Sequence, residues 1–551
     1  MLLAILFLQE GIAQENNLIQ LDKQNNPFDV NIRENTVFNT AYSDWYLLRG
    51  NPSFRHYFTR ERKKSYDFKA LSDKNLVMAS VTNTKNKGDY VFYRGDEYSS
   101  RSVLASGTMD FEKEGTLYGS ASYSTDKKNN TLLNYAVNPE HYYPYLVADT
   151  LGRGDQKYEV YNVQGGYGFA VKNTYYGIGF NYQGTAMSKL TDPRLSVYDS
   201  WFKIDLGVTR AFAKHLLALK ASYQINKQDI SAISTLYRAP SVLQFSGLGA
   251  WRNAEVTATQ GYERMLDIKG FAFEFTYKKL RPEKSDFGYS FSLGYSRNTM
   301  NTEDNSQLGF ESNSKLNLFT LDSHTISPLI IAEKEFSSFG LAFVLSGVNQ
   351  IKKGKDHIYK SEKVSNEQNL YNYIKVASNA FYTEYDFNNT ASVKATIPLR
   401  DHQRFHILTG TRHEFYKQEY VYPQQQIKSQ NLSPFVSLGY SKEGRSNNLG
   451  VSMLYAYRKS LDNTYNVSRA LNSISIDQSY IPFLIRSGSG FNLESQLFYS
   501  YNLAKGQRIG LRANLGYFHA NKYADIFPLI SNREIKSRKE LSLDFKLFYM
   551  F

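Results

Sequence analysis

The chain has 551 residues, with 44 Tyr, 36 Phe, no Cys and a formal net charge of +13. The mean hydropathy is −0.48, and no internal run reaches the ~20 apolar residues that a membrane-spanning helix needs. The lack of Cys excludes disulfides, metal–thiolate sites and cysteine nucleophiles. Two classes fit these values: a transmembrane β-barrel, which hides its apolar residues by alternation, and a large secreted β-protein.

The N-terminal region is predicted to precede the barrel strands. Residues 1–13, MLLAILFLQEGIA, join a short apolar core to small residues that a signal peptidase reads, so they predict a secretory signal. A buried helix or strand is the alternative. Residues 14–62 do not alternate cleanly and are expected to form a periplasmic arm or a small plug. Within them, RGNPSF (Arg49 to Phe54) resembles the Asn-Pro-small element in the hatch of fatty-acid-transporter-like barrels, although a turn is favoured because proline fixes φ.

Residues 63–551 are predicted to form an all-β, antiparallel up-and-down transmembrane barrel. In 202–209, for example, Phe, Ile, Leu and Val alternate with Lys, Asp, Gly and Thr, so opposite faces of a strand differ in polarity. Small polar residues suit a wet lumen. Tyr recurs at the ends of the apolar faces, as in an aromatic girdle at the membrane–water boundary: Tyr182, Tyr223, Tyr277, Tyr295, Tyr457, Tyr501 and Tyr517.

Connection lengths predict the orientation and the strand number. Short joints alternate with long connections, as expected for periplasmic turns and extracellular loops. Ser378 to Leu399 must then be one long, bulged strand, and one further strand belongs in 63–83. The expected total is about 18 strands, with 14 or 16 still open. The long connections are expected near 127–157, 188–200, 227–269, 297–315, 351–374, 418–431, 462–489 and 523–539.

Two of the long connections are rich in aromatic residues. They read NPEHYYPYLVADTLGRG (Asn138 to Gly154) and TLYRAPSVLQFSGLGAWRN (Thr235 to Asn253). Such side chains suit sugar stacking or partner docking. They equally suit loops that pack on themselves across the mouth of a pore. The sequence leaves both interpretations open.

The C-terminal segment LSLDFKLFYMF places an apolar residue at every second position. This pattern resembles the C-terminal assembly signal of bacterial outer-membrane proteins, which the barrel-assembly machinery reads. The residues that carry it are Leu543, Phe545, Leu547, Tyr549 and Phe551. With its many Tyr and Asn residues, the chain more broadly resembles a porin-like outer-membrane barrel of the Bacteroidota type. The resemblance implies an outer-membrane location.

The functional hypotheses follow from this fold. No catalytic or metal-binding motif stands out, so no enzyme activity, cofactor or metal is expected. The leading hypothesis is a passive channel for small polar solutes, with a lumen lined by Lys203, Asp205, Lys220, Gln224, Glu494, Arg508 and Arg512. The alternative is a plugged, non-conducting barrel that acts as a binding or scaffold subunit of a surface or secretion complex. A transporter of hydrophobic compounds and an outer-membrane hydrolase are minor alternatives.

The expected partners follow from the basic charge and the location. They are outer-membrane lipid and lipopolysaccharide, the barrel-assembly machinery, and a surface or periplasmic protein. An exported basic chain meets the phosphates of the outer leaflet, and no nucleic acid partner is expected.

Overall fold

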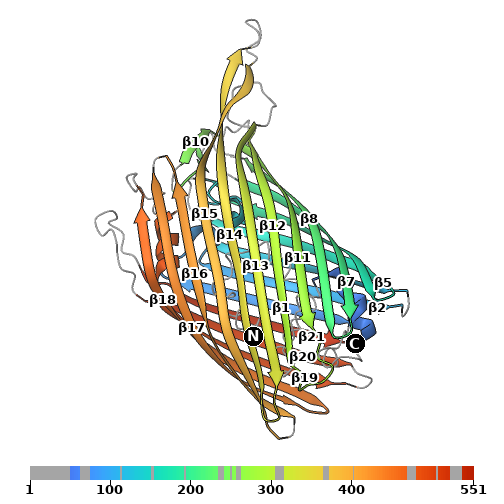
Figure 1. The fold of residues 1–551 in the computed structure, drawn as a ribbon. Coiled ribbons are helices and arrows are strands. Elements are labelled where there is room, and N and C mark those ends of the chain that lie inside the picture. Colours follow the sequence, from blue (N-terminus) through green and yellow to red (C-terminus); the bar gives the residue numbers. More distant parts are fainter. Residues whose placement is uncertain are drawn as a thin grey trace.

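The eighteen strands of the main sheet form a closed antiparallel barrel (Figure 1). A computed structural model describes residues 50–61, 75–111, 114–149, 154–191, 194–233, 241–248, 251–255, 262–304, 316–363, 371–400, 402–422, 424–467, 479–503, 507–521 and 536–551. The predicted signal segment and most of the predicted arm lie outside the described residues.

Each barrel strand pairs with the preceding and the following barrel strand, and the last strand pairs with the first. The ladder between them runs from Leu76↔Met550 to Lys87↔Lys539, so the sheet has no free edge. The barrel strands are β1 (Leu76–Lys87), β2 (Glu97–Asp110), β3 (Thr116–Thr131), β5 (Gly154–Val171), β6 (Thr174–Lys189), β7 (Arg194–Phe212), β8 (His215–Ile233), β11 (Tyr262–Lys279), β12 (Gly288–Asp304), β13 (Leu316–Glu335), β14 (Gly340–Lys363), β15 (Tyr371–Pro398), β16 (Gln403–Tyr420), β17 (Gln425–Glu443), β18 (Asn447–Asn466), β19 (Gly490–Asn502), β20 (Arg508–Ala520) and β21 (Lys539–Met550).

The predicted barrel and its strand number are confirmed, and three predicted long connections are wrong. As expected, β15 is one long strand, with register shifts against β14. Most of the connection expected near 351–374 is strand, because β14 runs to Lys363 and β15 begins at Tyr371. The connections near 188–200 and 418–431 are short, because β7 begins soon after β6 ends and β17 begins soon after β16 ends. Backbone pairing continues there although the apolar alternation has faded, since ladder hydrogen bonds need no apolar face.

The apolar face of the strands lies on the outside of the barrel. Phe273 on β11 is 56% exposed, whereas Thr276, which faces the lumen on the same strand, is 2% exposed. Large exposed apolar residues recur around the whole barrel, including β1, β7, β12, β18 and β21. Such a continuous apolar exterior requires hydrocarbon around it, so the chain is an outer-membrane barrel. Separately, none of the helices in the described residues is long and apolar enough to cross a bilayer.

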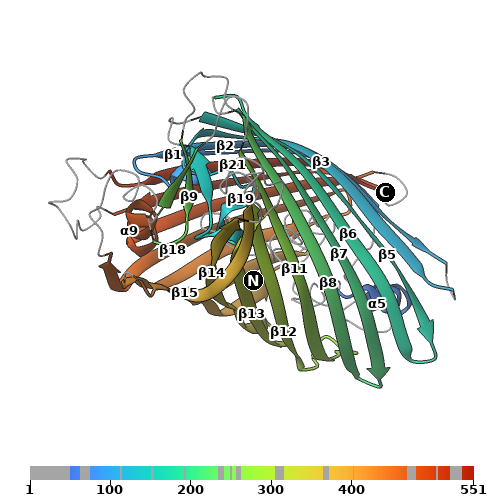
Figure 2. The same ribbon diagram turned by 90° about the horizontal axis from the view of Figure 1, so that it is seen from above.

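The short elements are not part of the barrel wall. They are α5 (Pro52–Glu61), η2 (Phe92–Arg94), α7 (Pro139–Tyr142), β4 (Val147–Asp149), β9 (Ser241–Phe245), β10 (Trp251–Glu255) and α9 (Ile481–Ser487). The strands β10, β9 and β4 form a separate sheet (Figure 2). Most of these elements belong to the connections at the long-loop end, while α5 precedes the barrel and lies near the short turns.

Candidate functional site in the barrel lumen

Two long connections meet and pair with each other at the long-loop end. We call residues 132–149 together with β9 and β10 the lumenal insert. Its sheet joins Val147 of β4 to Gln244 of β9, although these strands are far apart in the chain. The helix α7 begins at Pro139, a residue whose fixed φ suits the first turn of a helix. The insert is therefore a small folded unit built from two loops.

The insert shares one hydrophobic core with the inner face of the wall. This core includes Tyr142 and Leu146 of the insert and Leu266 and Ile268 of β11, all nearly or fully buried. The ring of Tyr145 stacks on Phe319 of β13 with centroids 4.4 Å apart. For the described residues of the two aromatic loops, the self-packing interpretation is therefore the correct one.

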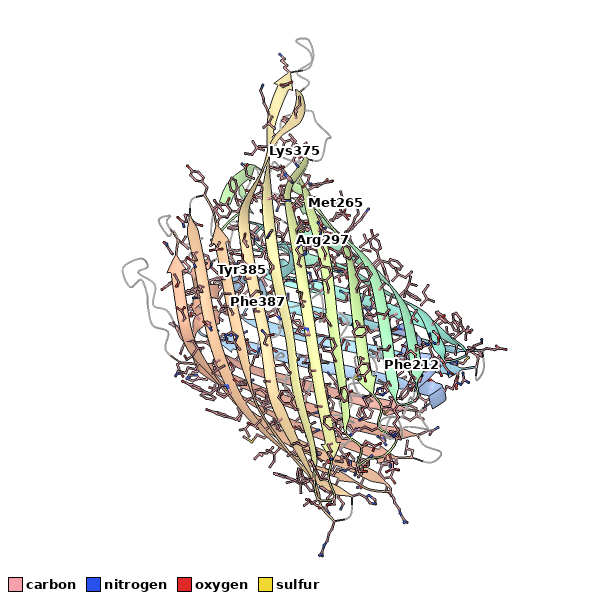
Figure 3. The ribbon with its side chains drawn as sticks, in the orientation of Figure 1. Phe212, Met265, Arg297, Lys375, Tyr385 and Phe387 are labelled. Carbon is pink, nitrogen blue, oxygen red and sulfur yellow. The ribbon has the colours of Figure 1, made fainter. Side chains whose placement is uncertain are left out.

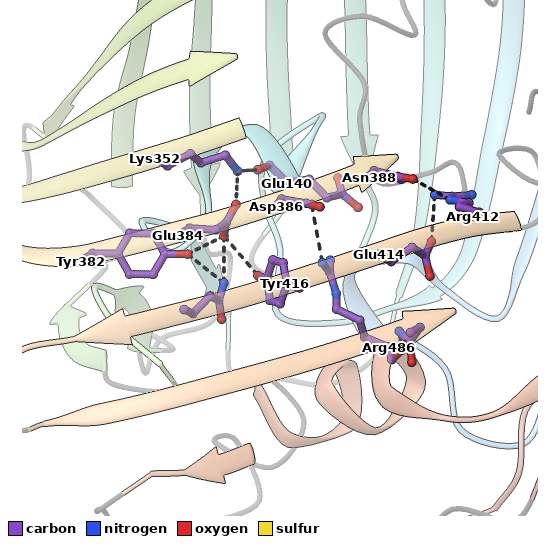
Figure 4. A network of polar contacts seen from close by, with 12 residues as sticks. Glu140, Lys352, Tyr382, Glu384, Asp386, Asn388, Arg412, Glu414, Tyr416 and Arg486 are labelled. Atoms are coloured by element: carbon purple, nitrogen blue, oxygen red, sulfur yellow. Dashed lines mark hydrogen bonds and ion pairs between the residues drawn. The ribbon is translucent and has the colours of Figure 1, made fainter. Parts of the chain in front are cut away.

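A buried ion pair fastens the insert to β14 and β15 (Figure 4). The Lys352 ammonium lies 2.9 Å from the Glu384 carboxylate, with side chains only 9% and 5% exposed. The same ammonium donates to the backbone carbonyl of Glu140 in α7 at 2.9 Å. Arg94 of η2 pairs with the Glu140 carboxylate at 2.9 Å. One charge from the wall and one from η2 thus hold the backbone and the side chain of the same α7 residue.

The buried Glu384 carboxylate has further donors. Tyr382 donates to it at 2.6 Å, Tyr416 at 3.1 Å and the Gln418 amide at 2.9 Å. A buried carboxylate is tolerated when charge and hydrogen bonds replace its lost water. The network can therefore keep Glu384 ionised and its rotamer fixed.

A second buried ion pair holds the insert from β11 and β12. Arg264 donates to Asp304 through two nitrogens, at 2.6 and 2.8 Å, and both side chains are almost fully buried. Its third contact is the carbonyl of Tyr145, at 3.1 Å. Tyr262 also donates to Asp304, at 2.9 Å. The planar guanidinium thus links the wall to the insert backbone.

Neutral hydrogen bonds hold the insert from β8. The Tyr142 hydroxyl donates to Asn226 at 2.8 Å, and the Val137 amide donates to Gln228 at 3.1 Å. Asn226 and Gln228 in turn donate to Asp199 of β7, at 2.7 and 2.9 Å. The insert therefore has polar anchors on β8, β11 and β14, which lie within one arc of five consecutive barrel strands.

The α9 segment is a second inward-packed unit. Ile481, Phe483 and Leu484 are buried in the same core as the insert. The Arg486 guanidinium lies 3.5 Å from the centroid of the Tyr416 ring and 3.6 Å from the Asp386 carboxylate. Arg458 of β18 donates to the carbonyls at the end of α9, including that of Arg486 at 2.8 Å. These contacts join α9 to the Glu384 network (Figure 4).

His141 in α7 is a titratable group inside this packing. Its ring lies edge-on to Trp201 of β7, with centroids 5.8 Å apart. Neither ring nitrogen has a hydrogen-bond partner in the described part of the chain. Burial, reinforced by the positive charge of Lys352, lowers the pKa of His141 to about 3. The imidazole is therefore neutral at physiological pH.

At the short-turn end, the helix α5 lies on the inner faces of β5, β6 and β7. Phe54, Tyr57 and Phe58 are buried against Tyr175 and Leu216. The described part of RGNPSF, residues 50–54, leads into this helix, and Asn51 accepts from the Ser53 amide at 3.2 Å. Asn51 also donates to the carbonyl of Leu219 at 2.9 Å, which fixes the helix start to β8.

Glycines on the wall make room for the start of α5. A Cβ at Gly168 would lie 2.9 Å from the carbonyl oxygen of Pro52. Cβ atoms at Gly177 and Gly207 would collide with Pro52 and Asn51, respectively. At Gly168 and Gly177 backbone therefore approaches backbone, and at Gly207 the Asn51 side chain occupies the space of a Cβ.

We predict that Gly177→Ala displaces α5 from its position against the barrel wall. The new methyl group would overlap backbone atoms of Pro52 and Ser53, which cannot rotate away. Because the chain has no Cys, a single Ser53→Cys change gives a clean probe. This thiol should be unreactive toward a hydrophilic maleimide in the parent barrel and reactive once Gly177→Ala is added. Gly294→Ala is the control, since its Cβ would lie an ordinary 3.6 Å from Ser327. Equal protection in both glycine variants would contradict the prediction.

The polar residues predicted to line a pore lie in two separate groups. Around β7, β8 and β11, Lys203 lies 3.7 Å from Asp205, Lys220 lies 3.0 Å from Glu274, and Gln224 donates to Asn298 at 2.6 Å. On β19 and β20, Glu494 accepts from Asn492 at 2.5 Å. Arg508 donates to Asn502 at 3.0 Å and Arg512 donates to Asn514 at 3.3 Å. The two groups do not converge on one site, and their role in conduction stays a prediction.

The predicted assembly-signal residues belong to β21 and the chain end. Leu543, Phe545, Leu547 and Phe551 are exposed on the outer surface, and Tyr549 pairs with Val77 of β1. Their recognition by the assembly machinery stays a prediction. Within the described residues, no group of three or more His, Asp or Glu side chains could hold a metal ion.

Sequence reasoning did not find the residues that hold the insert. Arg264 and Asp304 lie near the long-loop ends of β11 and β12, and Lys352 and Glu384 lie near the points where β14 and β15 leave the barrel wall. One available signal was that the lumen-facing positions of 262–268, Tyr, Arg, Leu and Ile, are mostly large and apolar. A water-filled lumen would not require such residues.

Comparison with known proteins gives a family and distant structural neighbours. No curated protein matches the chain. The siderophore receptor PiuA from Acinetobacter baumannii is 9% identical, with a TM-score of 0.38 over 86% of this chain and 82% of that one. The outer-membrane transporter YddB from Escherichia coli is also 9% identical, with a TM-score of 0.38 over 86% and 80%. The ferric yersiniabactin uptake receptor FyuA from Yersinia pestis is 8% identical, with a TM-score of 0.37 over 87% and 81%. A family model matches residues 68–549, and the chain therefore belongs to the family of unknown function DUF6850.

Proposed function

We propose that this protein is a plugged outer-membrane barrel that binds a partner at its long-loop end and does not conduct solutes freely. In this proposal the long loops face outward and the short turns face the periplasm. The lumenal insert and α9 obstruct one end, and α5 partly obstructs the other. The partner at this outward end is a surface protein, and a Bacteroidota origin is also part of the proposal.

The observation that carries the proposal is the hydrophobic core in the lumen. A passive channel for polar solutes needs a continuous wet path lined by polar groups. Here Tyr142, Leu146, Leu266 and Phe483 share one buried core at the long-loop end. Packed apolar side chains exclude water, so they favour a plug over the porin-like channel that the sequence first suggested.

A projecting β-ribbon supports the partner-binding part of the proposal. The ladders place β14 beside β13 only as far as Asp356, and β15 beside β16 only from Tyr382. Beyond these points the two strands pair with each other and project above the rest of the barrel (Figure 1). The ribbon exposes Ile358, Ile374 and Val376. Apolar side chains on a projecting ribbon are suited to contact with another protein.

Electrical recording tests the proposal directly. The purified full-length barrel, inserted into a planar bilayer at neutral pH, should show no sustained single-channel conductance. Folding of the sample is checked on a gel, where a folded barrel migrates more slowly after heating because heat unfolds it. Steady conductance steps from the folded wild-type protein would reject the plugged barrel and favour the porin-like channel.

A further inference from the structure

A cluster of cations lies on the outer surface of β12, β13 and β14, near the long-loop end. Arg297 lies 3.6 Å and Lys355 3.7 Å from the carboxylate of Asp322. Lys353 is the direct ladder neighbour of Asp322 on β14. The same carboxylate accepts from the Thr299 hydroxyl at 2.7 Å. Three cations therefore surround one acid.

The acid does not neutralise this cluster. Arg297 and Lys355 are each 46% exposed, whereas Asp322 is 17% exposed and lies between them. Ion pairs this long and this exposed are weak, so the cations can turn toward an added anion. Lys353 is also exposed. The surface of this cluster is strongly positive and points away from the lumen.

The cluster lies at the upper boundary of the apolar exterior. On β12 the outward-facing residues from Tyr289 to Tyr295 cover about 20 Å along the strand, at about 3.4 Å per residue. Arg297 is the next outward-facing position, and its ladder neighbour on β11 is Phe271. Arg297 and Tyr385 both lie on the outer surface in Figure 3. The apolar exterior of β12 therefore ends at Arg297, and lipid headgroups border such an edge in outer-membrane barrels.

We propose that Arg297, Lys353 and Lys355 form a binding site for the phosphorylated headgroup of an outer-leaflet glycolipid. The Arg297 guanidinium can bind a phosphate through two nitrogens, and the lysines add positive charge from the next strand. Phe271 lies beside Arg297 on β11, and Tyr295 is the previous outward-facing residue on β12, so both can contact the first acyl carbons. The choice of an outer-leaflet lipid rests on the proposed orientation, with the long loops outward.

Native mass spectrometry of the full-length barrel tests the site. The probe is bisphosphorylated lipid A added to the detergent-solubilised protein. We expect the wild type to retain it, and the triple variant Arg297→Gln, Lys353→Gln and Lys355→Gln to bind it about a hundredfold more weakly, since each surface cation contributes roughly fivefold. The control is Lys334→Gln, because Lys334 is exposed near Phe336 at the opposite end of β13 and should not affect binding.

Three results would overturn the proposal. The first is undiminished lipid A binding by a triple variant that still shows the gel migration of a folded barrel. The second is equal competition by inorganic phosphate, which would indicate a general anion surface. The third is equal binding of phosphatidylglycerol, which would indicate no preference for the glycolipid. None of these results depends on whether the lumen conducts, so the plugged barrel is tested separately.

Discussion

Arg264→Met should release the lumenal insert and turn a silent barrel into a conducting one. The substitution leaves the Asp304 carboxylate buried without its guanidinium, and it removes the donor to the Tyr145 carbonyl. Removing one partner of a buried ion pair typically costs about 3–5 kcal/mol. Because the strand ladders do not depend on this pair, we expect the cost to fall mainly on the packing of the insert. Single-channel recording should then show conductance that the wild type lacks.

The control for this experiment is Lys269→Met on the same strand. Lys269 pairs with Asp267 at 3.2 Å, but its side chain is 59% exposed. Exposed pairs contribute only about 0–1 kcal/mol, so this variant should remain silent. If Arg264→Met stayed as silent and as heat-resistant as the control, the ion pair would not be what holds the insert.

Acidification should loosen the insert through His141. The folded pKa of this histidine lies near 3, below its ordinary value of 6.5, because the packed site disfavours the charged ring. Between these two values the opened segment binds a proton that the packed segment does not, so stability falls as the pH falls. At pH 4.5 the packing of the insert should be weaker by roughly 2–3 kcal/mol than at pH 7.5.

Trp201 reports this change, because its ring contacts His141. The chain has three Trp residues, so Trp45→Phe and Trp251→Phe leave a single fluorophore. Its emission should shift to the red on acidification, and His141→Gln should abolish most of the shift. Glu140, Arg94 and Lys352 also lie around α7. A shift that persists undiminished in His141→Gln would assign the titration to one of these groups instead.

The contacts within the lumen could not be predicted from the sequence, whereas the two faces of each strand could. The alternation in 202–209 was sufficient to place Phe202 outside and Lys203 inside, because strand geometry is local and has a period of two. The same reasoning could not place Glu140 next to Lys352. These residues are 212 positions apart, and their contact depends on how two loops fold back into the barrel.

The sequence by itself determined an outer-membrane barrel with strands of the right number and the correct face toward lipid. Lipid on one side of the wall requires apolar residues and the lumen on the other side accepts polar ones, so the polarity of strand residues alternates. This pattern can be recognised within each short segment of the chain. Only the tertiary structure decided what occupies the lumen. Three features of the lumen join residues that are distant in sequence. They are the pairing of β4 with β9, the contact of α5 with glycines of the wall, and the ion pairs of Arg264 and Lys352. Such contacts have no period, because each is set by the packing of one particular side chain against another.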